Sequence, residues 1–289
     1  MKRFGVSTHL FHAERLTRGH VAAIAGHGFD AVELFATKSH FDYHDAKEIE
    51  ALAEWLAESR LDMPSVHAPI VDSLVNDTWG RAFSTAIRDA DARQATMTEM
   101  RAALDVARVI PFNLFVIHLG LPAAQHPGAH DNNRDAAVRS IEDIHEMAEP
   151  LGVKLALEVM GNAMSTAPAL VDLIENDLDG MDLRICMDVG HAFLLGDVTD
   201  AIETTSGYLA TTHLHDNRRQ HDEHLLPFEG AINWPETMMA FEKIGYDGVL
   251  MFEVKNTSTA AAVLERAARA RRRLESLAGS WELEAGSSS

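Results

Sequence analysis

The sequence predicts an α/β protein folded as a single (β/α)8 barrel domain, and three observations lead to this class. Short apolar segments alternate with longer amphipathic ones, about eight of each fit into about 275 residues, and no glycine-rich phosphate-binding turn follows an apolar segment. Such alternation indicates parallel strands joined by crossover helices. Eight units of this kind favour a closed barrel over an open doubly wound sheet, which is the alternative arrangement.

The expected strands are continuous apolar runs, as strands that are buried on both faces of a sheet require. They are residues 4–8, 31–35, 64–68, 114–118, 154–159, 183–189, 210–215 and 248–254. Between them, apolar residues recur every three or four positions, which predicts amphipathic helices. These helices are residues 16–28, 45–60, 90–110, 133–152, 167–177, 232–245 and 259–277, with a shorter and weakly patterned one around 197–205.

The folded domain is expected to cover residues 1–278, with a disordered tail at 279–289, because the last residues, LEAGSSS, are small and polar. No apolar run reaches the roughly 18 residues that a membrane span needs, and the N-terminal residues lack a signal-peptide pattern. The single cysteine, Cys186, is typical of a reducing compartment. We therefore expect a cytoplasmic protein with no membrane partner.

The charge balance limits the partners further. The chain has 44 acidic residues against 25 lysines and arginines, a formal net charge of −19. This charge repels polyphosphate backbones, so a nucleic-acid partner is not expected, whereas small ligands and metal cations are. Barrels of this kind often associate, and a homo-oligomer is compatible with the sequence, with no choice between dimer and tetramer.

Seven of the expected strands carry, at or near their ends, a residue that can bind a metal. These residues are Glu33, His67, His118, Glu158, Asp188, His213 and Glu253. One such histidine is commonly a hydrogen-bonded rim residue, and one such carboxylate is commonly a helix N-cap. Seven together need another explanation, because a buried carboxylate without a partner costs several kcal/mol and all these ends open on one face of a barrel. A bound cation supplies the shared partner.

Two further pairs point to the same site. The segment HLHDNRRQHDEH, residues 213–224, places Asp222 and His224 two residues apart, which directs both side chains to one side of an extended loop. Asp188 and His191 are one helical turn apart. Mixed carboxylate and imidazole ligands suit Zn²⁺, Mn²⁺ or Fe²⁺ better than Ca²⁺. Cys186 is expected to alternate off the ligand face and to pack in the core.

The motifs taken in order resemble those of the xylose-isomerase-like TIM-barrel superfamily, and the resemblance covers most of the chain. The superfamily contains sugar phosphate isomerases and epimerases, inosose dehydratases and the AP endonucleases of family 2, among them endonuclease IV. The matching segments are SVHAP, FVIHLG, LALEVMGN, CMDVGHAF, HLHDN, DEHLLPFEGAINW and MFEV.

The epimerase branch of this superfamily implies one catalytic divalent metal (Mn²⁺, Zn²⁺, Co²⁺ or Fe²⁺) held by Glu158, Asp188, His213 and Glu253. It also implies that Glu158 and Glu253 are catalytic, transferring a proton through an enediolate on a ketose or keto-sugar. A dehydratase or lyase acting on a keto-sugar or an inosose would use the same chemistry. Glu33, His9 and Arg218 are expected to bind the substrate.

The resemblance to endonuclease IV implies a different number of metals, because that enzyme holds three zinc ions. Its additional metal ligands, or additional substrate contacts, match His67, His118, His191, Asp222 and His224. More than one metal per chain is therefore allowed. The acidic charge, a first strand–loop (STHLFHAERL) that is not rich in glycine and serine, and the short loop after His213 argue against DNA repair.

Two details bear on the substrate. The pattern D-x-H-L-P-x-G-E-G of many sugar-type members reads DEHLLPFEG here, with Phe228 in place of a glycine, which puts phosphorylated substrates in doubt. The insertion after the third strand carries Trp79 and Phe83, which are expected either to cover the pocket or to pack against a second copy. The substrate itself is not specified by the sequence.

Overall fold

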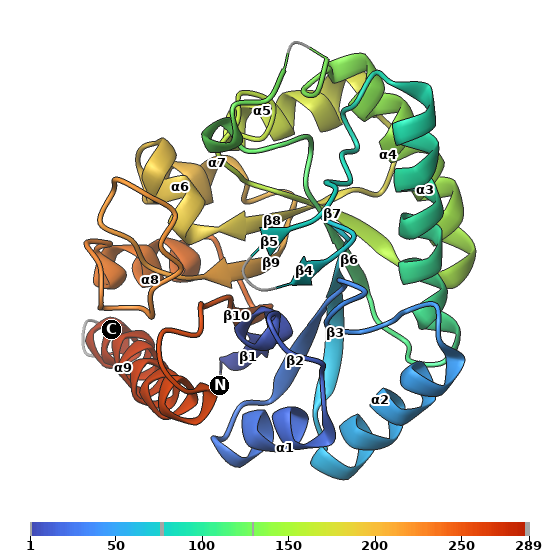
Figure 1. Ribbon diagram of the computed structural model, residues 1–289. Helices are drawn as coiled ribbons and strands as arrows, with labels where there is room; N and C mark the ends of the chain where they lie inside the picture. The colour runs from blue at the N-terminus through green and yellow to red at the C-terminus, as the bar shows by residue number, and fades with distance from the viewer. Residues whose placement is uncertain (1, 76–77, 129, 287–289) are drawn as a thin grey trace.

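The computed structural model describes residues 2–75, 78–128 and 130–286. Eight parallel strands form a closed barrel, and helices surround it (Figure 1). The strands follow the chain around the barrel, and β10 pairs with β1 to close it. Their bounds are β1 Arg3–Ser7, β2 Ala31–Phe35, β3 Asp62–His67, β6 Leu114–Ile117, β7 Lys154–Glu158, β8 Arg184–Asp188, β9 Leu209–Leu214 and β10 Val249–Phe252. The predicted fold class is confirmed.

The helices begin where a short polar side chain accepts a hydrogen bond from the backbone of the first turn. Such an N-cap satisfies an amide that the helix itself leaves unpaired. The caps of α1 to α8 are Thr17, Asp45, Asp89, Asn133, Thr166, Asp188, Asp197 and Asn233. The helices are α1 Arg18–Gly26, α2 Ala46–Ser59, α3 Ala90–Asp105, α4 Arg134–Ala148, α5 Ala167–Asp172, α6 Val189–Leu195, α7 Val198–Thr204, α8 Trp234–Lys243 and α9 Ala260–Gly286.

Three elements differ from the predicted ones. The helix α6 was not predicted, and it takes Val189 from the expected sixth strand. A short hairpin, β4 Leu74–Val75 with β5 Thr78–Trp79, forms within the insertion after β3 and lies over the middle of the barrel in Figure 1. The helix α9 continues to Gly286, into the expected tail, whereas residues 287–289 lie outside the described residues. The domain boundary at residue 278 remains a prediction.

Two layers of side chains fill the molecule. Apolar residues of the strands and helices form one large core between the barrel and its helices. Smaller groups lie inside the barrel, where Met251 packs beside Ala31 and Val249, and Cys186 packs beside Val116 and Ala156. In the described part of the chain, no helix combines the length and the apolar character that crossing a membrane takes.

A buried histidine ties together the loops that follow β1 and β2. The side chain of His40 is fully buried, and its Nδ1 donates a hydrogen bond to the carbonyl oxygen of Glu14 at 2.6 Å. Burial lowers the pKa of His40 from 6.5 to about 4, and the positive charges of Arg15 and the neighbouring His12 and His20 act in the same direction. The folded protein therefore keeps this ring neutral under conditions in which the unfolded chain protonates it.

We predict that this difference makes His40 a source of acid sensitivity. As the pH falls from 6.5 towards 4, the unfolded chain gains a proton that the folded chain does not, so the free energy of unfolding should fall by up to roughly 3 kcal/mol. The variant His40→Asn keeps an N–H group for Glu14 but cannot titrate, and its loss of stability with acid should be smaller. Urea unfolding of both proteins between pH 7 and pH 4.5 measures this; parallel curves would contradict it.

Candidate metal centre

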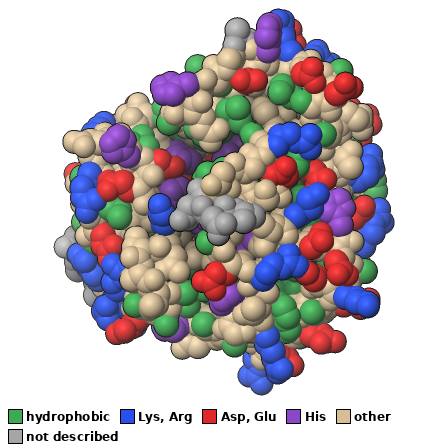
Figure 2. Space-filling model, viewed as in Figure 1, with side chains coloured by type: hydrophobic (Ala, Val, Ile, Leu, Met, Phe, Trp, Pro, Cys, Tyr) green, Lys and Arg blue, Asp and Glu red, His purple; other side chains and the backbone are tan. Residues whose placement is uncertain are grey.

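The predicted metal-binding side chains meet at the carboxyl-terminal face of the barrel. Because the strands are parallel, their carboxyl ends share one face, and Figure 2 shows histidine side chains gathered in a hollow near its centre. The carboxylates in this hollow are buried: Glu33, Glu158 and Asp188 completely, and Glu253 almost so. In the barrel register Asp188 lies opposite His213.

The first group comprises Glu158, Asp188, His213 and Glu253, one residue from each of four neighbouring barrel units. Their potential ligand atoms all lie within 4.8 Å of one another. Nδ1 of His213 is 3.5 Å from an oxygen of Glu158, 3.5 Å from one of Glu253 and 3.8 Å from one of Asp188. The four residues predicted to hold one catalytic metal are therefore brought together.

Glu33 orients the imidazole of this group. Its Oε1 is 3.0 Å from Nε2 of His213, and its other oxygen accepts a hydrogen bond from Ser65 at 2.7 Å. When Nε2–H donates to Glu33, the lone pair of Nδ1 points at the three carboxylates, which is how a carboxylate commonly orients a metal-bound histidine. Glu33 was expected to bind substrate; in the structure its contacts are with His213 and Ser65.

Unpaired polar atoms in the first group show whether its residues fit a cation. Among the described residues, both oxygens of Glu158 and Nδ1 of His213 are buried and have no hydrogen-bond partner. Buried polar atoms are almost always paired, so three unpaired atoms gathered in one cluster indicate a ligand. Two carboxylate oxygens and an imidazole nitrogen form a donor set suited to Zn²⁺, Mn²⁺ or Fe²⁺. The residues present fit a divalent cation.

A second group shares Glu158 with the first. Nε2 of His67 and Nε2 of His118 each lie 3.3 Å from the same oxygen of Glu158. Nδ1 of His67 is turned away, 2.9 Å from the carbonyl oxygen of Ala68. Both histidines thus present the nitrogen that a metal would take.

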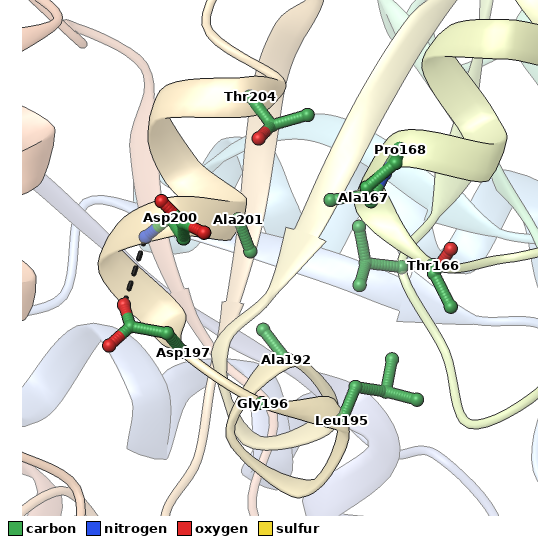
Figure 3. Close-up of a pocket in the computed structure, with 11 residues that line it drawn as sticks. Thr166, Ala167, Pro168, Ala192, Leu195, Gly196, Asp197, Asp200, Ala201 and Thr204 are labelled. Carbon is green, nitrogen blue, oxygen red and sulfur yellow. Dashed lines mark hydrogen bonds between the residues drawn. The ribbon is translucent and has the colours of Figure 1, made fainter.

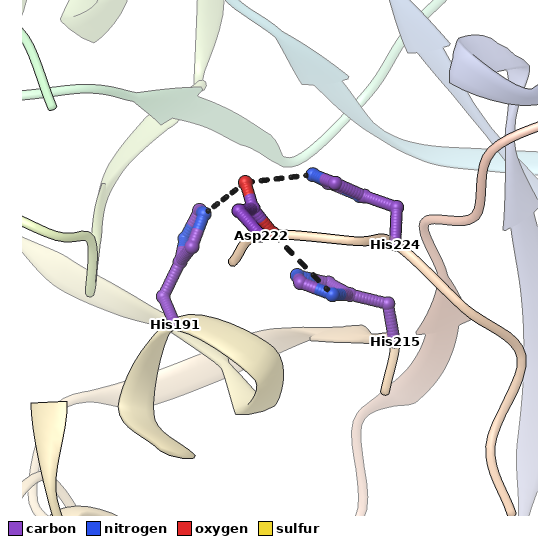
Figure 4. Close-up of side chains that lie close together, drawn as sticks. All are labelled: His191, His215, Asp222 and His224. Carbon is purple, nitrogen blue, oxygen red and sulfur yellow. Dashed lines mark hydrogen bonds and ion pairs between the residues drawn. The ribbon is translucent and has the colours of Figure 1, made fainter. Parts of the chain in front are cut away.

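His191, His215, Asp222 and His224 form a third group (Figure 4). One oxygen of Asp222 is 3.2 Å from Nε2 of His191 and 3.1 Å from Nε2 of His224. The His215 and His224 rings stack with their centroids 4.0 Å apart. Nδ1 of His215, buried and without a hydrogen-bond partner among the described residues, is 3.8 Å from the other oxygen of Asp222. The imidazole and carboxylate atoms of this group form a second donor set suited to a divalent cation.

His215 was not among the predicted site residues, although the sequence carries the signal. It follows His213 by two positions, and residues two apart on an extended strand point the same way. Nε2 of His215 lies 2.9 Å from an oxygen of Asp188, so this histidine connects the first and third groups.

Cys186 was expected to point away from the ligand face, and the structure places it elsewhere. It precedes Asp188 by two positions, so it lies on the ligand face rather than off it, and its sulfur is within 4.8 Å of ligand atoms of Glu158 and His213. Burial raises its thiol pKa far above the ordinary value, which keeps the thiol protonated. Its packing against Val116 and Ala156 agrees with the expected core role.

The charges of the centre stabilise one another. Burial alone would raise the pKa of Glu158, but the positive charges of His118 and His213 hold it well below its usual value. For His224 burial acts in the opposite direction and would lower the pKa, but the negative charge of Asp222 raises it to about 9. The imidazoles and carboxylates thus stabilise one another, and a divalent cation that binds there would displace protons from these groups.

One buried carboxylate shapes the loop that carries Asp222 and His224. Asp216 accepts hydrogen bonds from the backbone amides of Asn217, Phe228 and Ile232 and from the indole of Trp234, at 2.9–3.1 Å. These bonds hold a loop in which three residues other than glycine have positive φ: Arg219, His224 and Phe228. Phe228, with φ 74°, adopts the backbone conformation that favours the glycine expected there.

Of the remaining predicted residues, His9 lies close to the third group and Arg218 does not contact any of the three groups in the described contacts. His9 is buried, with its ring centroid 4.9 Å from that of His224 and 4.4 Å from that of His12. Arg218 is exposed and pairs with Glu223 at 2.5 Å, so the contacts described for it lie outside the three groups. A role for Arg218 in substrate binding stays a prediction.

A separate cavity of about 340 Å³ lies among α5, α6 and α7 on the outside of the barrel (Figure 3). Thr166, Leu195 and Asp200 are among its lining residues, and its described lining includes no member of the three groups. This cavity is therefore distinct from the candidate metal centre.

Comparison with known proteins agrees with the barrel fold. Residues 21–278 match the family described as xylose isomerase-like TIM barrel, so the chain belongs to that family. It is 31% identical over 261 residues to an uncharacterized protein of Methanocaldococcus jannaschii, covering 88% of this chain and 84% of that protein. It is 20% identical over 233 residues to an inosose isomerase of Halalkalibacterium halodurans, covering 76% of this chain and 80% of that enzyme.

Solved structures give the same picture. A D-tagatose 3-epimerase-like protein superposes with a TM-score of 0.79 at 27% identity, covering 97% of this chain and 99% of that one. The IolI protein, crystallised with a zinc atom, superposes with a TM-score of 0.74 at 16% identity, covering 97% and 99%. At 16% identity the second likeness concerns the fold.

We predict that Gly190→Ala disturbs the centre without disturbing the fold. A Cβ atom at position 190 would lie 2.1 Å from Cε1 and 2.3 Å from Nδ1 of His215, so the ring has to leave its present position beside Asp188 and Asp222. Zn²⁺ affinity should fall at least about tenfold, the usual effect of losing a supporting contact. Titration with a competing chromophoric chelator measures this. Gly26→Ala in α1, where a Cβ meets nothing within 4 Å, is the matched control; equal affinities of the two variants would refute the prediction.

Proposed function

We propose that this protein is a metal-dependent sugar isomerase or epimerase that transfers a proton on a ketose or keto-sugar. One observation carries the proposal: two glutamates, Glu158 and Glu253, converge with Asp188 and His213 on one buried point where three donor atoms lack a partner. The names of the similar proteins, a D-tagatose 3-epimerase-like protein and an inosose isomerase, support a sugar substrate. The zinc atom in the IolI structure supports a divalent metal.

The hard step in such a reaction is the removal of a proton from the carbon next to a carbonyl group. A divalent cation held by Glu158, Asp188, His213 and Glu253 would supply positive charge to the oxygens beside that carbon. The metal identity is left open among Mn²⁺, Zn²⁺, Co²⁺ and Fe²⁺.

The two glutamates then supply the proton transfers. Glu158 ends β7, whereas Glu253 follows β10, so their carboxylates approach the centre from strands separated by β8 and β9. One glutamate, as the carboxylate, takes the proton and leaves an enediolate, and the other, as the carboxylic acid, gives its proton to the opposite side of the carbon, which inverts it. Return to the neighbouring carbon would give the isomer instead. Burial of both carboxylates excludes water that would compete for these transfers.

A dehydratase acting on an inosose or keto-sugar would begin with the same proton removal and then expel a hydroxyl group. The same residues serve that first step, so the two reactions differ in product and not in the centre that starts them.

We predict that Glu158→Gln lowers the exchange of a substrate C–H proton in D₂O by about 100-fold or more, because a general base contributes on that order. Metal content should fall as well, since the charge of a shared ligand is lost. NMR of a panel of ketoses and keto-sugars in D₂O, with elemental analysis of the same samples, measures both. Glu142→Gln, on the exposed side of α4, is the control. A Glu158→Gln protein that keeps its metal and its exchange would remove this residue from the mechanism.

A second function, that of a phosphodiesterase of the endonuclease IV type, is favoured by one observation. The three groups share or touch common carboxylates, because Glu158 belongs to the first two and Asp188 contacts His215 of the third. This arrangement offers places for three metals. The net charge of −19 opposes binding to a DNA duplex.

We predict that the protein does not cleave a duplex containing an abasic site under conditions in which it exchanges a sugar C–H proton. The physical reason is the repulsion between the acidic surface and the phosphate backbone, which weakens the encounter. Gel analysis of the duplex, with metal counted on the same preparation, checks this. Three zinc ions per chain together with cleavage would favour the phosphodiesterase over the sugar enzyme.

A further inference from the structure

A second cavity adjoins the candidate metal centre at the side covered by the β4–β5 hairpin. It has a volume of about 360 Å³. Its walls come from the loop and hairpin after β3 and from the loop after β6. The lining residues used below are Ile70, Val71, Trp79, Ala82, Phe83, His118 and Leu121.

His118 connects this cavity to the centre. The same side chain lines the cavity and places its Nε2 3.3 Å from an oxygen of Glu158. Its backbone is held in place by the hydroxyl of Thr85, which donates a hydrogen bond to the His118 carbonyl at 2.8 Å. A molecule whose reacting carbon lies near Glu158 can therefore extend past His118 into the cavity.

The cavity wall is apolar. Ile70, Val71, Phe83 and Leu121 present hydrocarbon, and among the described lining side chains only His118, Gln125 and the Trp79 indole carry polar atoms. The hydroxyl groups of an unsubstituted sugar would lose water there and gain few hydrogen bonds in return, which is unfavourable. An apolar group gains by the same transfer.

The size and the rim of the cavity suit a ring. A cavity of about 150 Å³ is large enough to hold benzene, and this one is larger. At the rim, the Trp79 indole is 48% exposed and stacks on His12 with ring centroids 5.7 Å apart and planes 15° from parallel. His12 stacks in turn on His9, so aromatic surface continues from the cavity rim to the neighbourhood of His224.

We propose that this cavity is a subsite for an apolar, ring-sized group attached to the sugar, so that the substrate is a glycoside-type keto-sugar with an aromatic aglycone rather than a free sugar. This inference rests on the proposed function and specifies its substrate class. It gives Trp79 and Phe83 the covering role that was one of two expectations for the insertion.

The test compares two probes that differ only in the ring. Calorimetric titration of the full-length, Zn²⁺-loaded protein with phenyl β-D-glucopyranoside and with methyl β-D-glucopyranoside should show at least about tenfold tighter binding of the phenyl glycoside, which corresponds to about 1.4 kcal/mol. Ala82→Trp places a bulky side chain into the cavity from an exposed position. This variant should abolish the preference, and Leu121→Asn should reduce it by making the wall polar.

Leu195→Asn is the matched control, because Leu195 is 42% exposed and lines the separate cavity among α5, α6 and α7. It should keep the full preference for the phenyl glycoside. Equal affinities of the two glycosides in the wild type, no measurable binding of the phenyl glycoside, or a preference that survives both cavity variants would each overturn the subsite.

Proton exchange in D₂O on the same preparations reports on the proposed function separately. Exchange of a sugar proton without any phenyl preference overturns the subsite alone. A phenyl preference that Ala82→Trp removes supports the subsite even in a protein that fails to exchange a sugar proton, in which case the proposed function fails by itself.

Discussion

The structure depends on one electrostatic constraint, which is that four carboxylates are buried together at the mouth of the barrel. Glu33, Glu158, Asp188 and Glu253 all lie out of contact with bulk water. Burying even one unpartnered carboxylate is costly, so the fold places positive or polarisable groups around them. In the described part of the chain, histidine side chains are the groups that surround these carboxylates. A divalent cation would supply positive charge at the same place without requiring the histidines to be protonated. The parallel barrel makes the gathering of charge achievable, because it brings strand ends from distant parts of the chain to one face.

Strand ends and loops contribute to different parts of this face of the barrel. Strand ends carry the side chains of the first group, and the neighbouring strands on both sides hold them in register. The loops beyond the strands form the walls of the second cavity, to which the β4–β5 hairpin and the loop after β6 contribute. The loop after β9 is an exception, because it supplies Asp222 and His224 to the centre. The hydrogen bonds that Asp216 accepts hold this loop in its conformation.

Sequence reasoning was most successful where residues lie on regular elements. The continuous apolar runs predicted the barrel, the family was predicted from ordered motifs, and the strand-end residues predicted the first group of side chains. His215 and Cys186 were misjudged although strand alternation places them on the inner face with His213 and Asp188. The helix α6 was missed because it begins one residue after the strand ends. The hairpin and its cavity were beyond prediction, because they depend on loop packing that no periodicity encodes.

Asp188 has two duties in this structure, and they are linked through one carboxylate. Its Oδ1 accepts the amide of His191 and so begins α6, while both of its oxygens lie within reach of His215. A cation drawing on this carboxylate would also act on the first turn of a helix only seven residues long. The helix that lines the outer cavity therefore begins at a carboxylate of the candidate metal centre, so one side chain belongs both to the mouth of the barrel and to its outer wall.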